Sequence, residues 1–192
     1  MNLGLYGGSF DPVHLGHLLV AQAACEELAL DRLFFIPAAQ SPFKPDRKPA
    51  PAAERLRLLR LALAGNPRYE LDLQEVERGG ISYTINTVRD YERRFPGARL
   101  HYLIGADHVP SLPKWREAPE LAARVEFLVI PRPGEASLPP PPGFQLRELQ
   151  GFPLKVSSST LRERIRRGAS IQNLVPPAVE EAIRNYRLYL EG

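Results

Sequence analysis

The sequence predicts an α/β protein with a doubly wound, mainly parallel sheet and helices on both faces of that sheet. Short apolar runs alternate with longer amphipathic stretches along the chain, and parallel neighbouring strands need helical crossovers of this kind. A glycine pair, Gly7-Gly8, separates the first apolar run from the first helical stretch. The 192 residues are 44% hydrophobic and 24% charged, which suits one globular domain with its own core.

The first half of the chain predicts two strand-and-helix pairs. Asn2–Tyr6 is a short apolar run typical of a buried strand, and His14–Leu28 has the length and apolar content of a helix. The apolar run Arg32–Ile36 predicts the second strand, and the proline-rich stretch Pro37–Pro51 predicts a long loop. The helix expected at Ala53–Ala64 has its leucines on one face.

The middle of the chain continues the alternation. Leu71–Val76 alternates apolar and polar residues, which predicts a strand, and Ser82–Phe95 predicts a helix. The apolar run Leu100–Ile104 predicts the next strand. Glu117–Ala123 and Val125–Ile130 predict a further helix and strand.

The end of the chain is mainly helical. Leu154–Val156 predicts a last short strand, and a helix is expected from Ser157 to Arg167, with another after Pro176-Pro177. We therefore expect a single domain over residues 1–192, in which residues 157–192 form a C-terminal helical segment packed on the rest.

Charge and cysteine content narrow the classes of function. The net charge is +3, and arginines cluster at Arg55–Arg60 and Arg162–Arg167. Such clusters suit nucleic acid or phosphorylated small molecules, but we interpret them as solvated helix faces. The single Cys25 excludes a disulfide framework or a thiolate metal cage within one chain. No secretory signal or membrane span is visible, so we expect a cytoplasmic protein.

The segment after the first strand has the composition of a phosphate site. Gly7-Gly8 let the backbone approach a ligand closely, and the next helix offers free N–H groups at its N-terminus. His14 and His17 share one face of the first turn, where imidazoles can bond a phosphate and, when protonated, neutralise its charge. Helix capping without a ligand is the alternative. Gly16 favours a close approach by a ligand or neighbouring backbone, because glycine costs about 1 kcal/mol in a helix interior.

Four motifs, in order along nearly the whole chain, carry a family resemblance. They are GGSFDPVHLGH from Gly7, GISYTINTV at 80–88, IGADHVPSLPKW at 104–115 and VSSSTLR at 156–162. The first resembles the H-x-G-H signature of the nucleotidyltransferase superfamily, and together they are similar to the bacterial nicotinate-nucleotide adenylyltransferase family. The resemblance implies a Rossmann-like nucleotidyltransferase fold. It also implies transfer of AMP from ATP to nicotinate mononucleotide, which gives deamido-NAD and pyrophosphate in NAD biosynthesis.

The resemblance further implies roles for individual residues. His14 and His17 are the expected catalytic residues, which hold the ATP phosphates and stabilise the transition state. The expected ATP-binding residues are Gly7, Gly8, Ser9, Phe10, His14, His17, Asp107, Arg132, Ser158, Ser159 and Arg162. The expected acceptor-binding residues are Ser9, Phe10, Lys44, Arg47, Thr84, Trp115 and Arg116. Within this set, the indole of Trp115 stacks on the pyridine ring, and the N–H groups of Thr84 and Arg116 receive the carboxylate.

Simpler structural roles stay open for several of these residues. The serines from Ser157 onward are equally suited to cap a helix, and a lone Trp115 suits a core. Asp107 suits a cap of the next turn, and Arg132 suits a solvated surface. Phe43 stands where the family often has histidine, so one phosphate hydrogen bond is either missing or supplied by a neighbouring cation, Arg47 or Lys48.

The expected partners are ATP and nicotinate mononucleotide, with no nucleic acid and no membrane. Magnesium is the expected cofactor, carried by the ATP phosphates, because no carboxylate cage or His/Cys cluster is visible in the sequence. The alternative acceptors are nicotinamide mononucleotide, 4'-phosphopantetheine, or glycerol phosphate with CTP. A non-enzymatic RNA-binding module is the alternative from another class. A homo-oligomer stays open, since an apolar face with Ile183, Tyr186 and Tyr189 suits either the chain's own sheet or a partner.

Overall fold

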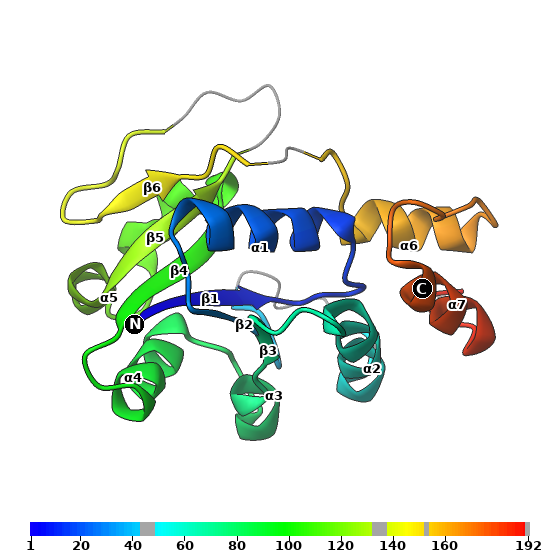
Figure 1. Ribbon diagram of the computed structural model, residues 1–192, viewed down its shortest axis with the longest axis horizontal. Coiled ribbons are helices and arrows are strands. Elements are labelled where there is room, and N and C mark those ends of the chain that lie inside the picture. The colour runs from blue at the N-terminus through cyan, green and yellow to red at the C-terminus, as the bar shows by residue number, and fades with distance from the viewer. Residues whose placement is uncertain (43–48, 132–137, 152–153, 191–192) are drawn as a thin grey trace.

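The computed structural model of the chain describes residues 1–42, 49–131, 138–151 and 154–190. Its sheet has six strands in the order β3-β2-β1-β4-β5-β6, and all neighbouring strands are parallel (Figure 1). The strands are β1 (Asn2–Gly8), β2 (Arg32–Pro37), β3 (Tyr69–Leu71), β4 (Arg99–Gly105), β5 (Val125–Ile130) and β6 (Leu146–Glu148). This order is the doubly wound, Rossmann-like arrangement, and it confirms the predicted fold class.

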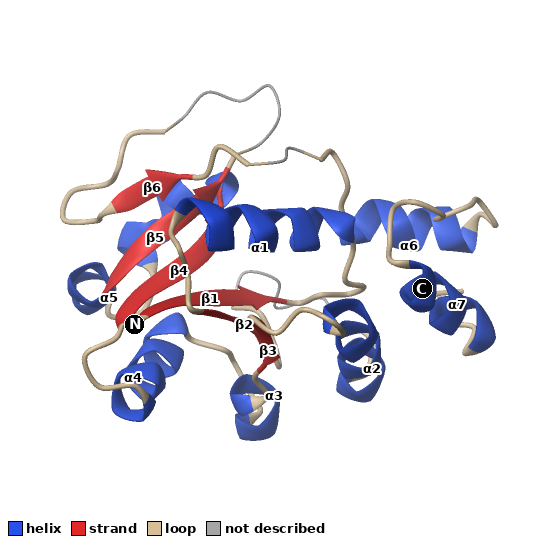
Figure 2. Ribbon diagram, in the orientation of Figure 1, coloured by secondary structure: helices blue, strands red, loops and turns tan. Residues whose placement is uncertain are grey.

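Helices lie on both faces of the sheet (Figure 2). The α-helices are α1 (Leu15–Glu27), α2 (Ala52–Leu63), α3 (Gln74–Arg78), α4 (Thr84–Arg94), α5 (Ala118–Arg124), α6 (Ser158–Arg166) and α7 (Pro177–Asn185). A 3-10 helix, η1 (Ala106–Lys114), follows β4 directly. The sequence prediction missed η1, whose two prolines hid its helical character. None of the helices in the described ranges is both long and apolar enough to cross a membrane.

Two apolar cores lie on the opposite faces of the sheet. Successive strand residues point to opposite faces, so Tyr6 and Phe35 belong to one core, whereas Leu5 and Phe34 belong to the other. The first core packs α1, α2 and α7 on the sheet, and the second packs α4, η1 and α5. Cys25 is buried in the first core, as its apolar surroundings in the sequence indicate.

The strand predicted at Leu71–Val76 is wrong beyond its first residue. The structure ends β3 at Leu71 and begins α3 at Gln74. The Asp72 carboxylate turns the chain, because it accepts a hydrogen bond of 3.0 Å from the backbone N–H of Gln74. Tyr91 of α4 donates a second hydrogen bond to this buried carboxylate at 2.5 Å. A contact nineteen residues away along the chain thus overrides the local alternation.

The prediction of a last strand after residue 151 is also wrong. Leu154–Val156 belongs to no strand, and β6 lies earlier, where Phe127 of β5 pairs with Leu146. The β6 segment is short, at the edge of the sheet, and only partly buried. Its sequence therefore lacks an apolar run of the kind that predicted the other strands.

The C-terminal helical segment packs against the chain itself. Ile183 is buried and Tyr189 packs on the same core, whereas Tyr186 is exposed with the Arg57 guanidinium 4.0 Å from its ring centre. Most of the apolar face noted in the sequence is therefore covered within this chain.

Candidate active site

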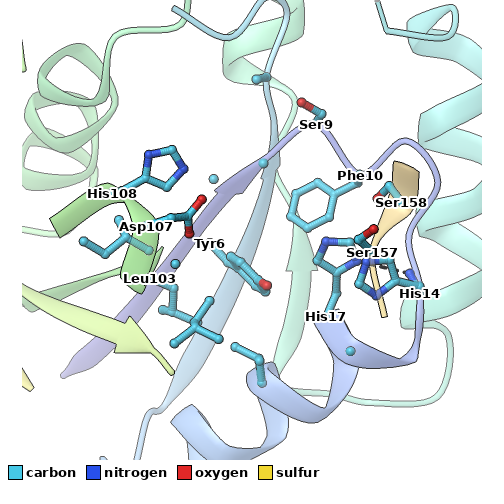
Figure 3. A pocket seen from close by; sticks show the side chains of 18 of the residues that line it. Tyr6, Ser9, Phe10, His14, His17, Leu103, Asp107, His108, Ser157 and Ser158 are labelled. Carbon is cyan, nitrogen blue, oxygen red and sulfur yellow. Dashed lines mark hydrogen bonds between the residues drawn. The ribbon is translucent and has the colours of Figure 1, made fainter. Parts of the chain in front are cut away.

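A cavity of about 880 Å³ opens at the carboxyl ends of β1 and β4. These two strands lead to helices on opposite faces of the sheet, and ligands bind doubly wound sheets at this switch point. Figure 3 places His14, His17, Phe10 and two serines on one side of the cavity, and Asp107 and His108 on the other.

Residues 7–12, the glycine loop, form the floor of the cavity. A Cβ atom on Gly7 would lie 2.2 Å from the Tyr102 hydroxyl oxygen, so only glycine fits there. Phe10 adopts a left-handed backbone conformation with φ of 45° and is buried against Tyr6 and His17. Such a conformation costs a residue with a side chain on the order of 1 kcal/mol. The surrounding packing therefore holds the loop in one shape.

Three side chains from the helices bind carbonyl groups of this loop. Arg55 of α2 donates to the Ser9 carbonyl at 2.8 Å, Ser158 of α6 donates to the Pro12 carbonyl at 2.9 Å, and Arg162 of α6 donates to the Asp11 carbonyl. Arg55 is 1% exposed. The expectation of solvated arginine faces is therefore wrong for Arg55 and for Arg162, whose side chain is only 13% exposed. Both arginines bind backbone inside the fold.

His14 and His17 form a stacked pair at the start of α1. Their ring centres are 3.7 Å apart, and Nδ1 of His17 accepts a hydrogen bond of 3.1 Å from the His14 backbone N–H. Since Nδ1 accepts, the neutral ring of His17 carries its proton on Nε2. His14 is the N-cap of the helix, so the capping alternative applies to it, and this position is compatible with the predicted ligand role. Nδ1 of His14 is buried and has no hydrogen-bond partner among the described residues, as expected where a ligand completes a site.

Burial keeps both imidazoles neutral in the unliganded protein. It lowers the pKa of His14 to about 4 and holds the pKa of His17 well below its usual range, where repulsion between the two rings, if both were protonated, lowers it further. The pair therefore offers N–H donors at neutral pH instead of fixed positive charge. A bound phosphate would raise both pKa values, because an opposite charge nearby favours the protonated form.

Gly16 is constrained by side chains. A Cβ atom there would lie 2.9 Å from Cγ1 of Val156 and 3.0 Å from Nδ1 of His14. The expected close approach is present, and the protein neighbours are a valine and an imidazole side chain instead of a backbone segment; Gly16 also lines the cavity. This contact seats the start of α1 against the chain that leads into α6.

The serine cluster divides its tasks. Ser157 caps α6, because its hydroxyl accepts a hydrogen bond of 3.2 Å from the Thr160 N–H. Ser158 holds the glycine loop, and Ser159 accepts a hydrogen bond of 3.0 Å from Arg162. Ser158, Ser159 and Arg162 all line the cavity. The structure thus brings these three predicted ATP-binding residues together, while the capping alternative applies to Ser157.

Trp115 lies on the opposite side of the cavity, directly after η1. Its Nε1 donates a hydrogen bond of 3.1 Å to the Ser111 hydroxyl, and its ring meets Phe127 edge to face at 6.0 Å between centres. Trp115 is half-buried, lines the cavity, and also packs on the second core. The core role and the predicted platform role are therefore compatible.

The other predicted residues of this side have different positions. Thr84 at the start of α4 and Asp107 in η1 line the cavity. The Arg116 side chain does not line it: this exposed side chain lies over the Tyr83 ring, 4.7 Å from the ring centre, so the predicted contact depends on the Arg116 backbone N–H alone. Three predicted residues, Lys44, Arg47 and Arg132, and also Phe43 and Lys48, lie outside the described residues.

Sequence reasoning missed several residues that line the cavity. Glu75 of α3 is buried, accepts a hydrogen bond of 2.5 Å from the Thr87 hydroxyl, and has a pKa that burial raises above its usual value. Tyr102, His108 and Lys155 line the cavity as well. Glu75 fell within the segment mistaken for a strand, and His108 lies inside a recognised motif, where its position directly after Asp107 was a usable signal.

The described residues offer no protein cage for a metal ion. No group of three or more His, Cys, Asp or Glu side chains in them is arranged to hold one. The acidic side chain of the glycine loop, Asp11, is already engaged. It is buried, its carboxylate accepts a hydrogen bond of 3.2 Å from the Ala50 N–H, and its Oδ2 lies 3.6 Å from Nη1 of Arg162.

Comparison with known proteins places these features in a family. The profile of the cytidylyltransferase-like family matches residues 5–164. A probable nicotinate-nucleotide adenylyltransferase of Opitutus terrae is 41% identical over 98% of both chains. One from Gemmatimonas aurantiaca is 43% identical over 100% of this chain and 93% of its own length.

Solved structures show the same fold. A nicotinic acid mononucleotide adenylyltransferase of Plasmodium falciparum, complexed with NaAD, superposes with a TM-score of 0.79 over 98% of this chain and 97% of its own, at 18% identity. The relatives named above share this chain's length and around two fifths of its residues. The chain therefore belongs to the nicotinate-nucleotide adenylyltransferase family, within the cytidylyltransferase-like nucleotidyltransferases.

Proposed function

We propose that this protein transfers AMP from ATP to nicotinate mononucleotide, forming deamido-NAD and pyrophosphate in NAD biosynthesis. The observation that carries the proposal is one cavity with the stacked His14–His17 pair on one side and Trp115 on the other. The curated relatives described above carry the name of this activity. An aromatic platform and a phosphate site that face the same space suit a pyridine mononucleotide and a triphosphate.

The reaction needs positioning more than covalent chemistry. A phosphate oxygen of the acceptor attacks the α-phosphorus of ATP, and the bond from that phosphorus to the bridging oxygen of pyrophosphate breaks. Orientation of the two substrates in such systems contributes about 7 to 11 kcal/mol. No residue is needed as a nucleophile, because the acceptor phosphate is the nucleophile.

The nucleotide is held by the first side of the cavity. The Nε2–H of His17 and the imidazole of His14 donate to phosphate oxygens, and they stabilise charge that develops as pyrophosphate leaves. The backbone N–H of Ser158, the Ser159 hydroxyl and the Arg162 guanidinium bind the triphosphate, since N–H and O–H donors, and the planar guanidinium above all, suit phosphate oxygens. The backbone of Gly7, Gly8, Ser9 and Phe10 lines the path between the substrates. Asp107 accepts from a ribose hydroxyl, and Arg132 binds near ATP.

The acceptor is held by the second side. The pyridine ring stacks on Trp115, and the N–H groups of Thr84 and Arg116 donate to its carboxylate. Backbone donors favour a carboxylate over an amide, because the amide NH₂ presents hydrogen where an acceptor is required. Lys44 and Arg47 bind the mononucleotide phosphate.

Magnesium fits this site as an ion that enters bound to the phosphate oxygens of ATP. The donors that face the cavity are mostly N–H groups and hydroxyls, which suit phosphate oxygens, and magnesium prefers oxygen ligands such as phosphates and water. When bound, the ion neutralises charge on the triphosphate and on departing pyrophosphate. Removing magnesium with EDTA should abolish pyrophosphate release, and adding excess Mg²⁺ should restore it. Full turnover in EDTA would contradict this role.

The decisive experiment measures pyrophosphate release with ATP, Mg²⁺ and one acceptor at a time. We expect turnover with nicotinate mononucleotide, a much lower kcat/KM with nicotinamide mononucleotide, and no turnover with 4'-phosphopantetheine. His17→Ala should lose the activity with every acceptor. Preference for another acceptor would keep adenylyl transfer and reject the proposed substrate, and an inactive wild type would reject the function itself.

A further inference from the structure

Arg55 is the most deeply buried charged side chain near the cavity, and the proposed mechanism does not use it. It is 1% exposed, and it does not line the cavity. Its Nη1 donates to the Ser9 carbonyl at 2.8 Å, and its Nε donates to the Ala50 carbonyl at 3.0 Å. Burying a guanidinium costs several kcal/mol unless its donors are satisfied. Packing alone therefore does not explain why a buried arginine donates its hydrogen bonds to two backbone carbonyl groups.

The hydrogen bond to Ser9 determines the orientation of one peptide group. A trans peptide is planar, so its C=O and N–H point in opposite directions. Arg55 holds the Ser9 carbonyl from the interior side, and the N–H of Phe10 in the same peptide is thereby directed away from Arg55. This N–H donates to no residue in the described parts of the chain. Ser9 and Phe10 both line the cavity.

The rest of the loop supports the same orientation. Phe10 has the left-handed φ of 45°, and its ring packs 5.0 Å from the His17 ring between centres. Figure 3 shows the Phe10 ring beside the two histidines. The Asp11 carboxylate accepts from the Ala50 N–H, so Ala50 is held by Arg55 at its carbonyl and by Asp11 at its N–H. The segment that leads into α2 and the glycine loop are therefore linked through one buried guanidinium.

We propose that Arg55 is a positioning residue that fixes the Ser9–Phe10 peptide, so that the Phe10 N–H is a preorganised donor to the phosphate oxygens that react. The inference rests on the proposed function. A donor held in place before the reaction needs no reorganisation as charge develops, and loss of one such donor typically costs about 10²- to 10³-fold in kcat. Arg55 would act through the loop and would not touch the substrates.

The test compares two positions on the same helix. Arg55→Met removes both carbonyl contacts, and Arg55→Lys keeps the charge but not the two-pronged geometry. Arg57→Met is the matched control: it removes the contacts of Arg57 with Glu54 and the Tyr186 ring but leaves the glycine loop untouched. Each variant is assayed for pyrophosphate release at a temperature well below its own Tm, with kcat, the KM for ATP and the KM for the acceptor measured separately.

We expect kcat to fall about 100-fold in Arg55→Met and about tenfold in Arg55→Lys, with the KM for ATP changed less than threefold. Arg57→Met should lower Tm but keep kcat within twofold of the wild type. If Arg55→Met and Arg55→Lys lose Tm but keep kcat, Arg55 is only structural and the inference is wrong. If Arg55→Met does not fold, Arg55→Lys decides between these outcomes. An inactive wild type would instead reject the proposed function, so the two failures are distinguishable.

Discussion

The two sides of the cavity are built in different ways. On the side with His14 and His17, the proposed nucleotide side, side chains bind the backbone of the glycine loop: Arg55, Ser158 and Arg162 hold its carbonyl groups. On the side with Trp115, the proposed acceptor side, side chains bind one another, as Thr87 binds Glu75 and Trp115 binds Ser111. Peptide groups that side chains hold in place suit the chemistry at phosphorus, whereas the Trp115 indole and the side chains packed around it suit recognition of the acceptor ring. Substitutions on the two sides should therefore affect different kinetic constants.

The largest effect is expected on the nucleotide side. His17→Ala removes the Nε2–H donor and also the acceptor for the His14 N–H. We expect kcat to fall about 10³-fold, with the KM for ATP changed less than threefold, because the donor acts mainly on charge that develops in the transition state. Steady-state kinetics of pyrophosphate release measure both constants.

Gln22→Ala is the control for this substitution. Gln22 lies on α1 like His17, but among the described residues its exposed amide bonds only Glu26 in the same helix. It should leave kcat unchanged. A loss of kcat below tenfold in His17→Ala would mean that the histidine pair is a helix cap and that the chemistry lies elsewhere in the cavity.

An intermediate effect is expected on the acceptor side. Trp115→Ala removes the indole, and stacking of a base on an aromatic side chain is worth about 1–3 kcal/mol. The KM for the acceptor should rise about 10- to 100-fold while the KM for ATP changes little. Trp115→Phe keeps an aromatic face but removes the Nε1 donor that bonds Ser111, so it should recover most of the affinity. Equal changes in the KM values of both substrates would contradict the division of the cavity into two sides.

Local patterns were enough to predict a parallel sheet and the residues that follow β1, although they misplaced β6 and extended β3 too far. The alternation of apolar strands with helices determines the parallel order, and the glycine loop with His14 and His17 lies within eleven consecutive residues. The serine cluster was equally visible, since a hydroxyl-rich segment at a helix start has few other uses. Each of these signals is carried by neighbours in sequence.

Three features that sequence reasoning missed depend on distant contacts. Arg55 looks like any arginine on an amphipathic helix until the fold buries it under Ser9, 46 residues away. Asp72 ends β3 because Tyr91 and Arg94 bind its carboxylate. The same error hid Glu75, whose partner Thr87 is twelve residues away. Single-sequence patterns contain the period of an element but not the burial of a polar group.

The two sides should also respond to pH with opposite signs, which is the smallest effect expected. On the nucleotide side, the pKa of His14 is lowered from 6.5 to about 4 by burial. Between these values the unfolded chain binds a proton that the folded chain does not, so stability falls as the pH falls. On the acceptor side, burial raises the pKa of Glu75 above 4.5. The folded chain then binds the extra proton, and this group adds stability as the pH falls.

Urea unfolding at pH 7 and pH 5.5 without nucleotide measures the balance. From its two pKa values, His14 should lower the free energy of unfolding by about 1 kcal/mol over this range, and the lowered pKa of His17 acts in the same direction. His14→Gln should therefore lose less stability between the two pH values than the wild type does, and Glu75→Gln should lose more. An unchanged difference in His14→Gln would mean that the imidazole is hydrated in solution. The pKa of His14 would then lie near its usual value, and a minor fraction of the His14 rings would already be protonated at neutral pH before ATP arrives.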